Sequence, residues 1–320
     1  MRKLLIAMSA EEMKPMQSAW QEAATLSHSH TIFQNFDWNQ QAARIFAASQ
    51  SPFVVMAQSD SGVAVIPACV DFSNRRLSLL GEELFDYRDA IATGDPSLLE
   101  QCWDSIIALS GKTGLGFGFH SLRNASERSE WQGLSLAPFT NAPCILVRDR
   151  ANFHHPRLAL NMRRLQRTGV VLREYSGDDA VILKNIYALK AQESGSLFAD
   201  PARIEMLLAM ASTAGLCCNI YTLEHSSSLV AALVTFRDQQ WRRFYTTYYS
   251  EAWAKYSPGL TLLHHVVNES LAAGLNCDFM TGAQPYKLRL ATAEAPLYRV
   301  TATPEDLQTS CNQPALAESA

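Results

Sequence analysis

Apolar positions in the first half of the chain recur at helical spacing in some stretches and in short β-branched runs in others. Helical spacing predicts helices over residues 1–28 and Phe33–Ala48. The short runs predict an antiparallel meander of strands at Pro52–Gln58, Gly62–Phe72 and Arg76–Leu80. The same criteria predict the remaining elements of this half: a helix over Pro96–Ser110 with Asp95 as its N-cap, and strands over residues 114–122 and Cys144–Val147.

The second half repeats this order of elements without obvious sequence identity to the first. A short charged segment, residues 149–158, separates the two and predicts domains at 1–148 and 149–320. The apolar pattern then predicts a strand at Val171–Tyr175, helices at Asp178–Glu193 and 201–213, and strands at Cys217–Glu224, Leu229–Arg237 and Trp241–Ser250. A repeated α+β unit is therefore the expected architecture.

The stretch after the last of these strands has the order turn, helix, strand. Ser257-Pro258-Gly259 precedes an apolar helical pattern that ends at Gly274, and a strand is expected at Cys277–Thr281. The first turn of a helix has N–H groups without partners and a positive dipole, so it stabilises a phosphate group without any basic side chain. Proline suits that first turn, and glycine lets a ligand approach the backbone. The alternative is an ordinary capped helix between two strands.

Composition and charge exclude several classes of protein. Hydrophobic residues make up 48% of the 320 residues, which allows sizeable cores, and 27 basic against 31 acidic residues give a net charge of −4. That balance argues against a DNA-binding or general nucleic-acid-binding protein, which would carry a basic field. The seven cysteines are scattered without a C-x-x-C pair, as expected for reduced thiols in a cytoplasm.

The start of the chain could be mistaken for a secretion signal. Its apolar run, Leu4–Met8, is too short for one, because Glu11-Glu12 follow at once. No stretch approaches the roughly 18 apolar residues of a transmembrane segment. We therefore expect a soluble cytoplasmic protein, with attachment to a peripheral membrane complex left open.

Several motifs suggest chemistry that their surroundings do not support. The run GLGFGFHSL at residues 114–122 lacks both phosphate-loop spacings and is better explained as a strand whose glycines permit close packing. His154-His155 are adjacent on a loop without an acidic cluster, which is a poor metal site, so no metal is expected. The aromatic residues Phe33, Phe36 and Trp38 are expected in the core.

Two polar segments are candidate substrate-binding sites. Arg163 and Arg167 lie in a basic helical run, and arginine can grip phosphate or carboxylate with two donors at once. The alternative for this run is a solvated helix face. Asp89 ends the loop Phe85–Asp89, which could line a substrate groove or form a surface turn with a salt bridge.

A set of motifs in the second half resembles a known family. The set comprises Tyr245 with Tyr248-Tyr249, Ser257-Pro258-Gly259, Asp278-Phe279-Met280, Gly282, and Tyr286-Lys287. It resembles the core of the CelD/BcsL-like acetyltransferases, a branch of the GNAT superfamily related to the FemAB-type tandem-GNAT transferases. The resemblance covers about residues 30 to 300 and is clearest in the second half.

The resemblance implies a fold and an activity. The fold would be a tandem GNAT-like (acyl-CoA N-acyltransferase) α+β fold, with two mixed sheets flanked by helices and the acyl-CoA site in the second half. The activity would be transfer of an acetyl or other acyl group from CoA to an amine or hydroxyl. The acceptor would be a small molecule or glycan precursor, such as a sugar or a polysaccharide precursor, or a peptide.

The resemblance also implies roles for individual residues. Residues implied in acyl-CoA binding are Tyr248, Ser257, Pro258, Gly259, Leu260 and Thr261. Residues implied in proton transfer or charge stabilisation are Tyr249, Asp278 and Lys287, and those implied in binding the acceptor are Asp89, Arg163, Arg167 and Tyr286. Tyrosines in strands more often pack, and Asp278 has a structural alternative as a partner of Lys287 or Arg289.

One departure from the GNAT pattern leaves other functions open. The common turn reads Arg/Gln-x-x-Gly-x-Gly/Ala, whereas residues 255–261 carry one glycine preceded by proline. FemAB-type relatives need not use CoA, so an aminoacyl-tRNA-dependent transferase is one alternative. A non-catalytic component of an envelope or polysaccharide assembly is the other.

Overall fold

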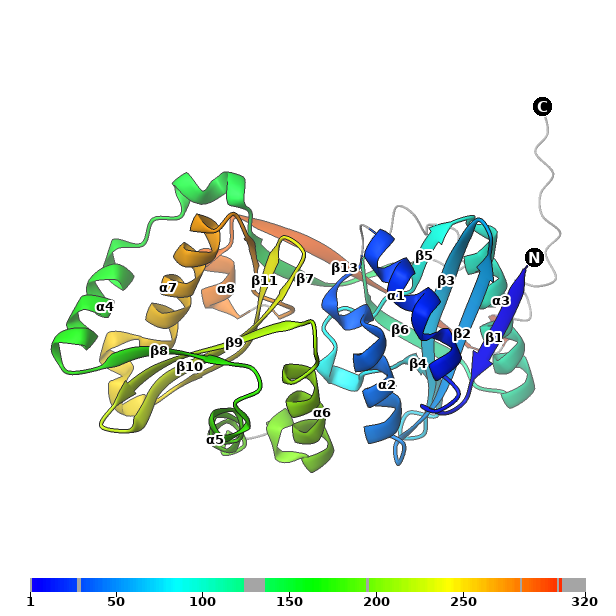
Figure 1. The fold of residues 1–320 in the computed structure, drawn as a ribbon, viewed down its shortest axis with the longest axis horizontal. Helices are drawn as coiled ribbons and strands as arrows, with labels where there is room; N and C mark the ends of the chain where they lie inside the picture. Colours follow the sequence, from blue (N-terminus) through cyan, green and yellow to red (C-terminus); the bar gives the residue numbers. More distant parts are fainter. Residues whose placement is uncertain are drawn as a thin grey trace. The chain divides into compact units, whose positions relative to one another are not determined.

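The chain folds into two compact units, each with its own strands and helices (Figure 1). The structure, a computed structural model, describes residues 2–27, 30–123, 136–193, 196–282, 284–303 and 305–306. Unit 1 comprises Met1–Thr140 and Pro296–Ala320, and unit 2 comprises Asn141–Ala295. The units therefore meet before the expected boundary at residue 148, and the end of the chain belongs with unit 1.

Unit 1 is built on a mixed sheet. Its strands are β1 (Lys3–Ala7), β2 (Gln50–Ser59), β3 (Gly62–Asp71), β4 (Arg76–Leu79), β5 (Ile91–Gly94), β6 (Phe117–Leu122) and the end of β13 (Ala293–Ala302). Their order is β1-β2-β3-β4-β6-β13, with β5 paired to β3. Only β4 and β6 run parallel, at Leu77↔Phe117.

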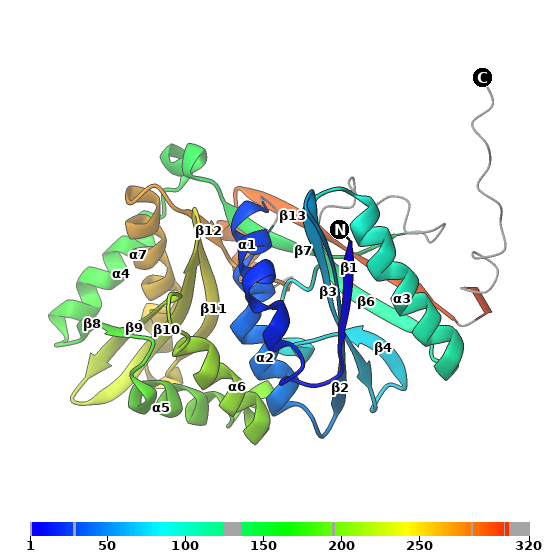
Figure 2. The same cartoon turned by 45° about the vertical axis from the view of Figure 1, so that its right-hand side comes forward.

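The helices of unit 1 cover both faces of this sheet. They are α1 (Gln17–Leu26), α2 (Phe36–Ile45) and α3 (Ser97–Thr113), with short 3-10 turns η1 (Lys14–Met16), η2 (Ile32–Gln34) and η3 (Glu82–Leu84). Figure 2 shows α1 and α2 on one side of the strands and α3 on the other. Leu98 and Ile106 of α3 pack on one face, and Trp20 of α1 and Phe36 of α2 pack on the other.

The first 28 residues are the main error of the sequence-based prediction in unit 1. A helix was expected there, but Lys3–Ala7 forms a strand that pairs antiparallel with β2, and the helix begins only at Gln17. The pairing to β2 overrides the local helical pattern of these residues. Phe33, Phe36 and Trp38 are each at most 1% exposed, as expected for core residues.

Unit 2 has a mixed sheet of the same kind. Its strands are β7 (Ala137–Ile145, which begins in unit 1), β8 (Val171–Ser176), β9 (Cys217–His225), β10 (Ser228–Asp238), β11 (Trp241–Tyr249) and β12 (Asn276–Asp278). Their order is β7-β12-β11-β10-β9-β8, in which only β11 and β12 are parallel.

Helices pack on both faces of this second sheet as well. They are α4 (Pro156–Arg167), α5 (Ala180–Lys190), α6 (Pro201–Ala211), α7 (Pro258–Ala272) and α8 (Pro285–Leu290), with 3-10 turns η5 (Val147–Asn152), η6 (Leu197–Ala199) and η7 (Glu251–Tyr256). Leu262 and Val266 of α7 and Leu165 of α4 share one core with the strands. The helices α5 and α6 lie on the opposite side, below the strands in Figure 1.

The two units repeat one plan and exchange their last strands. Each has three antiparallel strands, a helix and a parallel strand: β2-β3-β4, α3, β6 in unit 1 and β9-β10-β11, α7, β12 in unit 2. The strand that follows β6 along the chain, β7, pairs with β12, and β13 pairs with β6. This confirms the expected tandem α+β fold with mixed sheets, and the return of β13 explains why residues from Pro296 onward belong to unit 1.

Candidate active site at the end of β11

The parallel pair β11–β12 separates after the third residue of β11. The register runs Trp241↔Asn276, Arg242↔Cys277 and Arg243↔Asp278, and β12 ends there while β11 continues to Tyr249. A register shift in the pairing with β10 skips Tyr245, so β11 carries a bulge just after the separation. Bulges of this kind re-aim the strand and are common next to active sites.

Asp278 accounts for the early end of β12. Its Oδ1 accepts a hydrogen bond of 2.8 Å from the N–H of Met280, whose φ of 63° lies in the left-handed region. Gly282 follows with a φ of 106°. These residues turn the chain away from β11, so the expected strand Cys277–Thr281 stops at Asp278.

Asp278 also belongs to a buried group of three charges. Its Oδ2 accepts from the Arg243 guanidinium, and Nε of Arg243 donates to Asp238 at 2.7 Å. Arg243 is 2% exposed, Asp278 4% and Asp238 8%. Buried charges persist only when they are paired, so Asp278 is an ionised partner of Arg243. The sequence left open a structural role for Asp278, with Lys287 or Arg289 as its partner. In the structure the partner is Arg243.

The start of α7 has the geometry expected of an anion site. Ser257 precedes the helix with a left-handed φ of 48°, Pro258 is in the first turn, and no side chain caps the helix. Within the described part of the chain, the N–H groups of Gly259 and Leu260 have no acceptor. Two unpaired donors at the positive end of a 15-residue helix favour a bound anion.

Side chains from two helices fix the turn before α7. The carbonyl oxygen of Tyr256 accepts from Nδ2 of Asn161 in α4 and from Oγ1 of Thr261, both at 3.0 Å. The N–H of Thr261 donates to Ser257 O at 2.9 Å, so both donors of Thr261 are used within the protein. Asn161 is only 5% exposed. The sequence analysis did not find it, because a lone asparagine in a basic helical run gives no signal of its contact with η7.

The end of β11 touches the start of α7. A Cβ added to Gly259 would lie 3.4 Å from Cβ and Cδ1 of Tyr249, so glycine allows this close approach. Tyr249 is 54% exposed. Tyr248 points to the other face of the strand, and burial, followed by the nearby charge of Glu193, raises its pKa. Of the two adjacent tyrosines, Tyr249 therefore borders the helix start.

The predicted pair Tyr286-Lys287 begins the short helix α8. Tyr286 makes a side-chain hydrogen bond with Thr247 of β11, and burial raises the pKa of Tyr286. Lys287 is 8% exposed, and its Nζ donates to the carbonyl oxygen of Thr281 at 2.6 Å. Tyr286 thus holds α8 against the part of β11 that β12 leaves.

The remaining predicted substrate residues have different surroundings. Arg163 and Arg167 are exposed on α4, consistent with either a solvated face or an accessible clamp. Asp89 belongs to unit 1, is 3% exposed, and accepts from the N–H of Arg123 at 3.3 Å. Asp89 is thus buried within unit 1, whereas Arg163 and Arg167 are on α4, the helix that packs beside α7 in unit 2.

A histidine lies beneath the helix start. His264 of α7 is 8% exposed, and its ring lies 5.3 Å from that of Phe153 and 6.0 Å from that of His155. Burial, followed by the charge of His155, lowers the pKa of His264 to about 4, so it is neutral at pH 7.

The described residues contain no cluster of side chains able to hold a metal ion. Among the described helices, none combines the length and hydrophobicity needed to cross a bilayer.

Comparisons with known proteins agree with this geometry. Residues 155–288, which lie within unit 2, match the family model described as the acetyltransferase (GNAT) domain. No curated protein matches the chain.

Solved structures with the same fold cover nearly the whole chain. A tandem GNAT protein from the clavulanic acid biosynthesis pathway has a TM-score of 0.55 at 10% identity, over 95% of this chain and 99% of its own. FemX gives 0.58 at 7% identity, over 97% and 100%. L-PGS from Bacillus licheniformis gives 0.55 at 11% identity, over 82% and 86%. At these identities the likeness concerns the fold. Residues 155–288 of unit 2 thus match the acetyltransferase (GNAT) domain, and the chain as a whole has the tandem GNAT fold.

Proposed function

We propose that the protein transfers an acyl group, acetyl in the simplest case, from CoA to an amine or hydroxyl group. The observation that carries this proposal is the uncapped start of α7 in contact with the end of β11, where β12 has turned away. The free N–H groups of Gly259 and Leu260 would hold the CoA diphosphate, with Ser257 and Pro258 shaping the turn. The edge of β11 beyond Arg243 would then be open to the acyl-bearing arm.

The reaction needs one bond to form, one to break and one proton to move at each end. The acceptor nitrogen or oxygen forms a bond to the acyl carbon and releases a proton, while the carbon–sulfur bond breaks. Tyr249 borders the helix start, so its hydroxyl would donate a proton to the departing CoA sulfur. Asp278 and Arg243 are paired and buried, so we assign Asp278 to shaping the site rather than to proton transfer.

The acceptor is proposed from the resemblance to CelD/BcsL-like enzymes, as a sugar, a polysaccharide precursor or a peptide. Exposed arginines on α4, Arg163 and Arg167, could bind an anionic group on such an acceptor. Lys287 and Tyr286 lie beside the open part of β11 and would face the acyl or acceptor side.

Calorimetry with acetyl-CoA tests the cofactor. The wild-type protein should bind, and Gly259→Trp should not, because the indole ring would enter the contact between Tyr249 and α7. Gly111→Trp is the matched control, since an added side chain at Gly111 of α3 meets nothing within 4 Å. Absence of binding by the wild type to acetyl-CoA and longer acyl-CoAs would reject the proposal, as would equal binding by both variants.

Steady-state kinetics test the role of Tyr249. Tyr249→Phe should lower kcat by about 100-fold, the lower end of general acid catalysis, with little change in KM for acyl-CoA. Tyr248→Phe is the control, because this tyrosine points to the other face of β11. Equal kcat values for the two variants would remove Tyr249 from the chemistry.

A second candidate is an aminoacyl-tRNA-dependent transferase. FemX shares the fold over 97% of this chain, and the exposed arginines of α4 could contact RNA phosphates. The net charge of −4 does not favour it. Transfer of a radiolabelled amino acid from charged tRNA, without any binding of acyl-CoA, would establish this candidate. Failure of both assays in the folded protein would favour a non-catalytic role in an envelope or polysaccharide assembly.

A further inference from the structure

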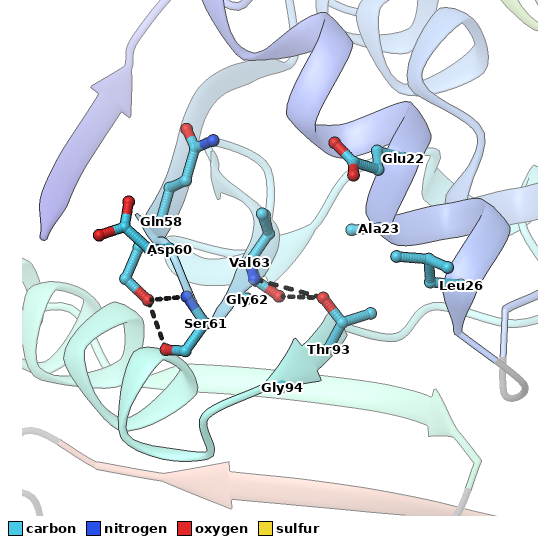
Figure 3. A pocket seen from close by; sticks show the side chains of 11 residues that line it. Glu22, Ala23, Leu26, Gln58, Asp60, Ser61, Gly62, Val63, Thr93 and Gly94 are labelled. Carbon is cyan, nitrogen blue, oxygen red and sulfur yellow. Dashed lines mark hydrogen bonds between the residues drawn. The ribbon is translucent and has the colours of Figure 1, made fainter. Parts of the chain in front are cut away.

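Two cavities lined by described residues of unit 1 differ in electrostatic character. The first, of about 300 Å³, lies between α1, the β2–β3 hairpin and β5 (Figure 3). Its lining includes the carboxylates of Glu22 and Asp60. Thr93 Oγ1 lies 3.3 Å from both the N–H and the carbonyl oxygen of Val63, so this hydroxyl is used between the strands. Nothing in this cavity points to a ligand.

The second cavity, of about 390 Å³, is lined by two consecutive arginines. It lies where β4 and β6 begin and β13 ends, and Arg75, Arg76, Thr301 and Thr303 face it. The one carboxylate in its lining, Asp306, accepts from the N–H of Thr303 at 2.8 Å and from its hydroxyl at 3.0 Å. Within the described part of the chain, neither arginine forms an ion pair with a carboxylate.

Arg76 is held flat against the floor of this cavity with an unused donor. Its Nε is buried and has no hydrogen-bond partner among the described residues. A Cβ added to Gly118 would lie 3.0 Å from Nη1 of Arg76, so the guanidinium rests directly on the backbone of β6. Gly118, in the glycine-rich run at residues 114–122, thus makes room for the Arg76 guanidinium. That is a more specific use than the close strand packing expected from the sequence.

A buried guanidinium, that of Arg88, lies near the half-buried Arg76, and the carboxylates of Asp86 and Glu83 are close enough to favour its charge. Arg88 is 6% exposed, and its Nη2 lies 3.1 Å from Nε2 of His120. Burial, and then the charges of Arg88 and Arg76, lower the pKa of His120 to about 4. His120 is therefore neutral at pH 7 and does not add a third charge. Both arginines nonetheless lie near enough to His120 to disfavour a positive charge on its ring.

Arg75 occupies a backbone conformation that its residue type rarely adopts. Its φ is 49°, in the left-handed region where glycine or asparagine is usual, at the turn between β3 and β4. The side chain is exposed and lines the cavity. Strain of this kind is retained where it positions a functional group.

We infer that this cavity of unit 1 binds the phosphate group of a small anionic ligand, through Arg75 and Arg76. Two adjacent guanidinium groups offer planar forks of donors to phosphate oxygens, and Thr301 supplies a hydroxyl at the rim. The volume exceeds that of a single phosphate, so the ligand is a phosphorylated small molecule. The site is distinct from the α7 site of unit 2 and does not depend on the proposed acyl transfer.

Calorimetry with inorganic pyrophosphate at low salt tests this site. We would use the Gly259→Trp protein as the background, so that the start of α7 does not contribute. Pyrophosphate should bind, and Arg75→Gln and Arg76→Gln should each weaken binding by about tenfold or more. Arg44→Gln is the matched control, because Arg44 is an exposed arginine on α2 away from the cavity. It should leave the affinity unchanged.

A fourth variant separates geometry from charge. Gly118→Ala keeps both arginines but puts a methyl group 3.0 Å from Arg76 Nη1, so it should weaken binding without changing net charge. Arg75 is exposed, so its variant reports on binding even if a change at Arg76 perturbs folding. No binding of pyrophosphate by the background protein would overturn the inference. A loss of affinity in Arg44→Gln equal to that in Arg75→Gln would overturn it as well.

Discussion

Helices α3 and α7 occupy the same place in the two units, yet they begin differently. α3 begins at Ser97, after Asp95-Pro96, and Oδ1 of Asp95 accepts from the N–H of Ser97 at 3.0 Å and from its hydroxyl at 2.8 Å. α7 begins at Pro258, after Ser257, with no capping side chain. In unit 1 the Asp95 carboxylate supplies an anion to the first turn of α3. Arg2 contacts this carboxylate at 3.0 Å. In unit 2 the equivalent donors, the N–H groups of Gly259 and Leu260, have no acceptor among the described residues.

The parallel strand pairs differ in the same sense. In unit 1 the register Leu77↔Phe117 joins two buried apolar residues of the core. In unit 2 the register ends at Arg243↔Asp278, a buried ion pair whose aspartate also turns the chain away from β11. One copy of the plan is thus completed as a packed structure, and the other keeps an uncapped helix and a separating strand pair.

The largest expected effect is the loss of the buried charges that distinguish unit 2. Asp278→Asn leaves Arg243 with one carboxylate instead of two and weakens the bond that holds Met280. We expect a loss of about 3 kcal/mol in the free energy of unfolding, because breaking a buried pair is costly. Urea unfolding measures it. Asp178→Asn, an exposed carboxylate of the same unit, should change stability by ~0.5 kcal/mol or less. Similar losses in the two variants would show that the buried group is not a stabilising feature.

The fold was largely predictable from the sequence because its signals are local. Apolar periodicity located both helices that follow the three-strand meanders, and Asp95 and Pro258 marked where they begin. The strands β1, β5 and β13 were missed, because each depends on a distant partner rather than on its own pattern. The exchange of β7 and β13 between the units has no local signature at all.

The candidate site was predictable only where a single segment encodes it. One stretch of sequence contains both Tyr249 and the start of α7 at Pro258 and Gly259, so these could be predicted together. The contacts of Arg243 and Asn161 join residues that are 35 and 95 positions from their partners, and no spacing rule connects them. Asp278 was noticed for being polar in an apolar strand. Its partner could be known only once β11 and β12 were paired.

A change at Ser257 makes the start of α7 resemble that of α3. Ser257→Asp places a carboxylate beside the donors of Gly259 and Leu260, where it competes with a diphosphate and repels it. Acetyl-CoA should bind about tenfold more weakly, with little change in stability. Calorimetry at two salt concentrations measures the effect, which should shrink as salt screens the charge. Ser257→Asn, which also tolerates the left-handed φ, is the neutral control and should bind normally. Equal weakening by Asn would point to the turn's shape instead of its charge.

Each unit also contains a neutral histidine, buried in unit 2 and partly buried in unit 1, which makes stability depend on pH. The pKa of His264 in unit 2 and that of His120 in unit 1 are lowered to about 4, chiefly by burial. The unfolded chain binds these protons near pH 6.5, so unfolding becomes easier as pH falls from 6.5 towards 4. The His264→Gln variant should show a shallower dependence of stability on pH. Between pH 6.5 and 5.5, its free energy of unfolding should fall by about 1 kcal/mol less than that of the wild type. Thermal melts across this range test it, and an unchanged slope would mean that His264 is protonated in the folded protein.

The smallest expected effect comes from opening the start of α3. Asp95→Ser converts Asp-Pro-Ser into Ser-Pro-Ser, close to the Ser-Pro-Gly of α7. It also removes the carboxylate that accepts a hydrogen bond from the N–H of Ser97. The melting temperature should fall by less than in Asp278→Asn, because Asp95 is at the surface and serine can cap in its place. No second acetyl-CoA should bind, since β4 ends at Leu79 and offers no exposed tyrosine beside the helix. A second binding event in calorimetry would mean that an uncapped helix start is sufficient by itself. The separation of β11 from β12 would then not be what makes unit 2 the binding unit.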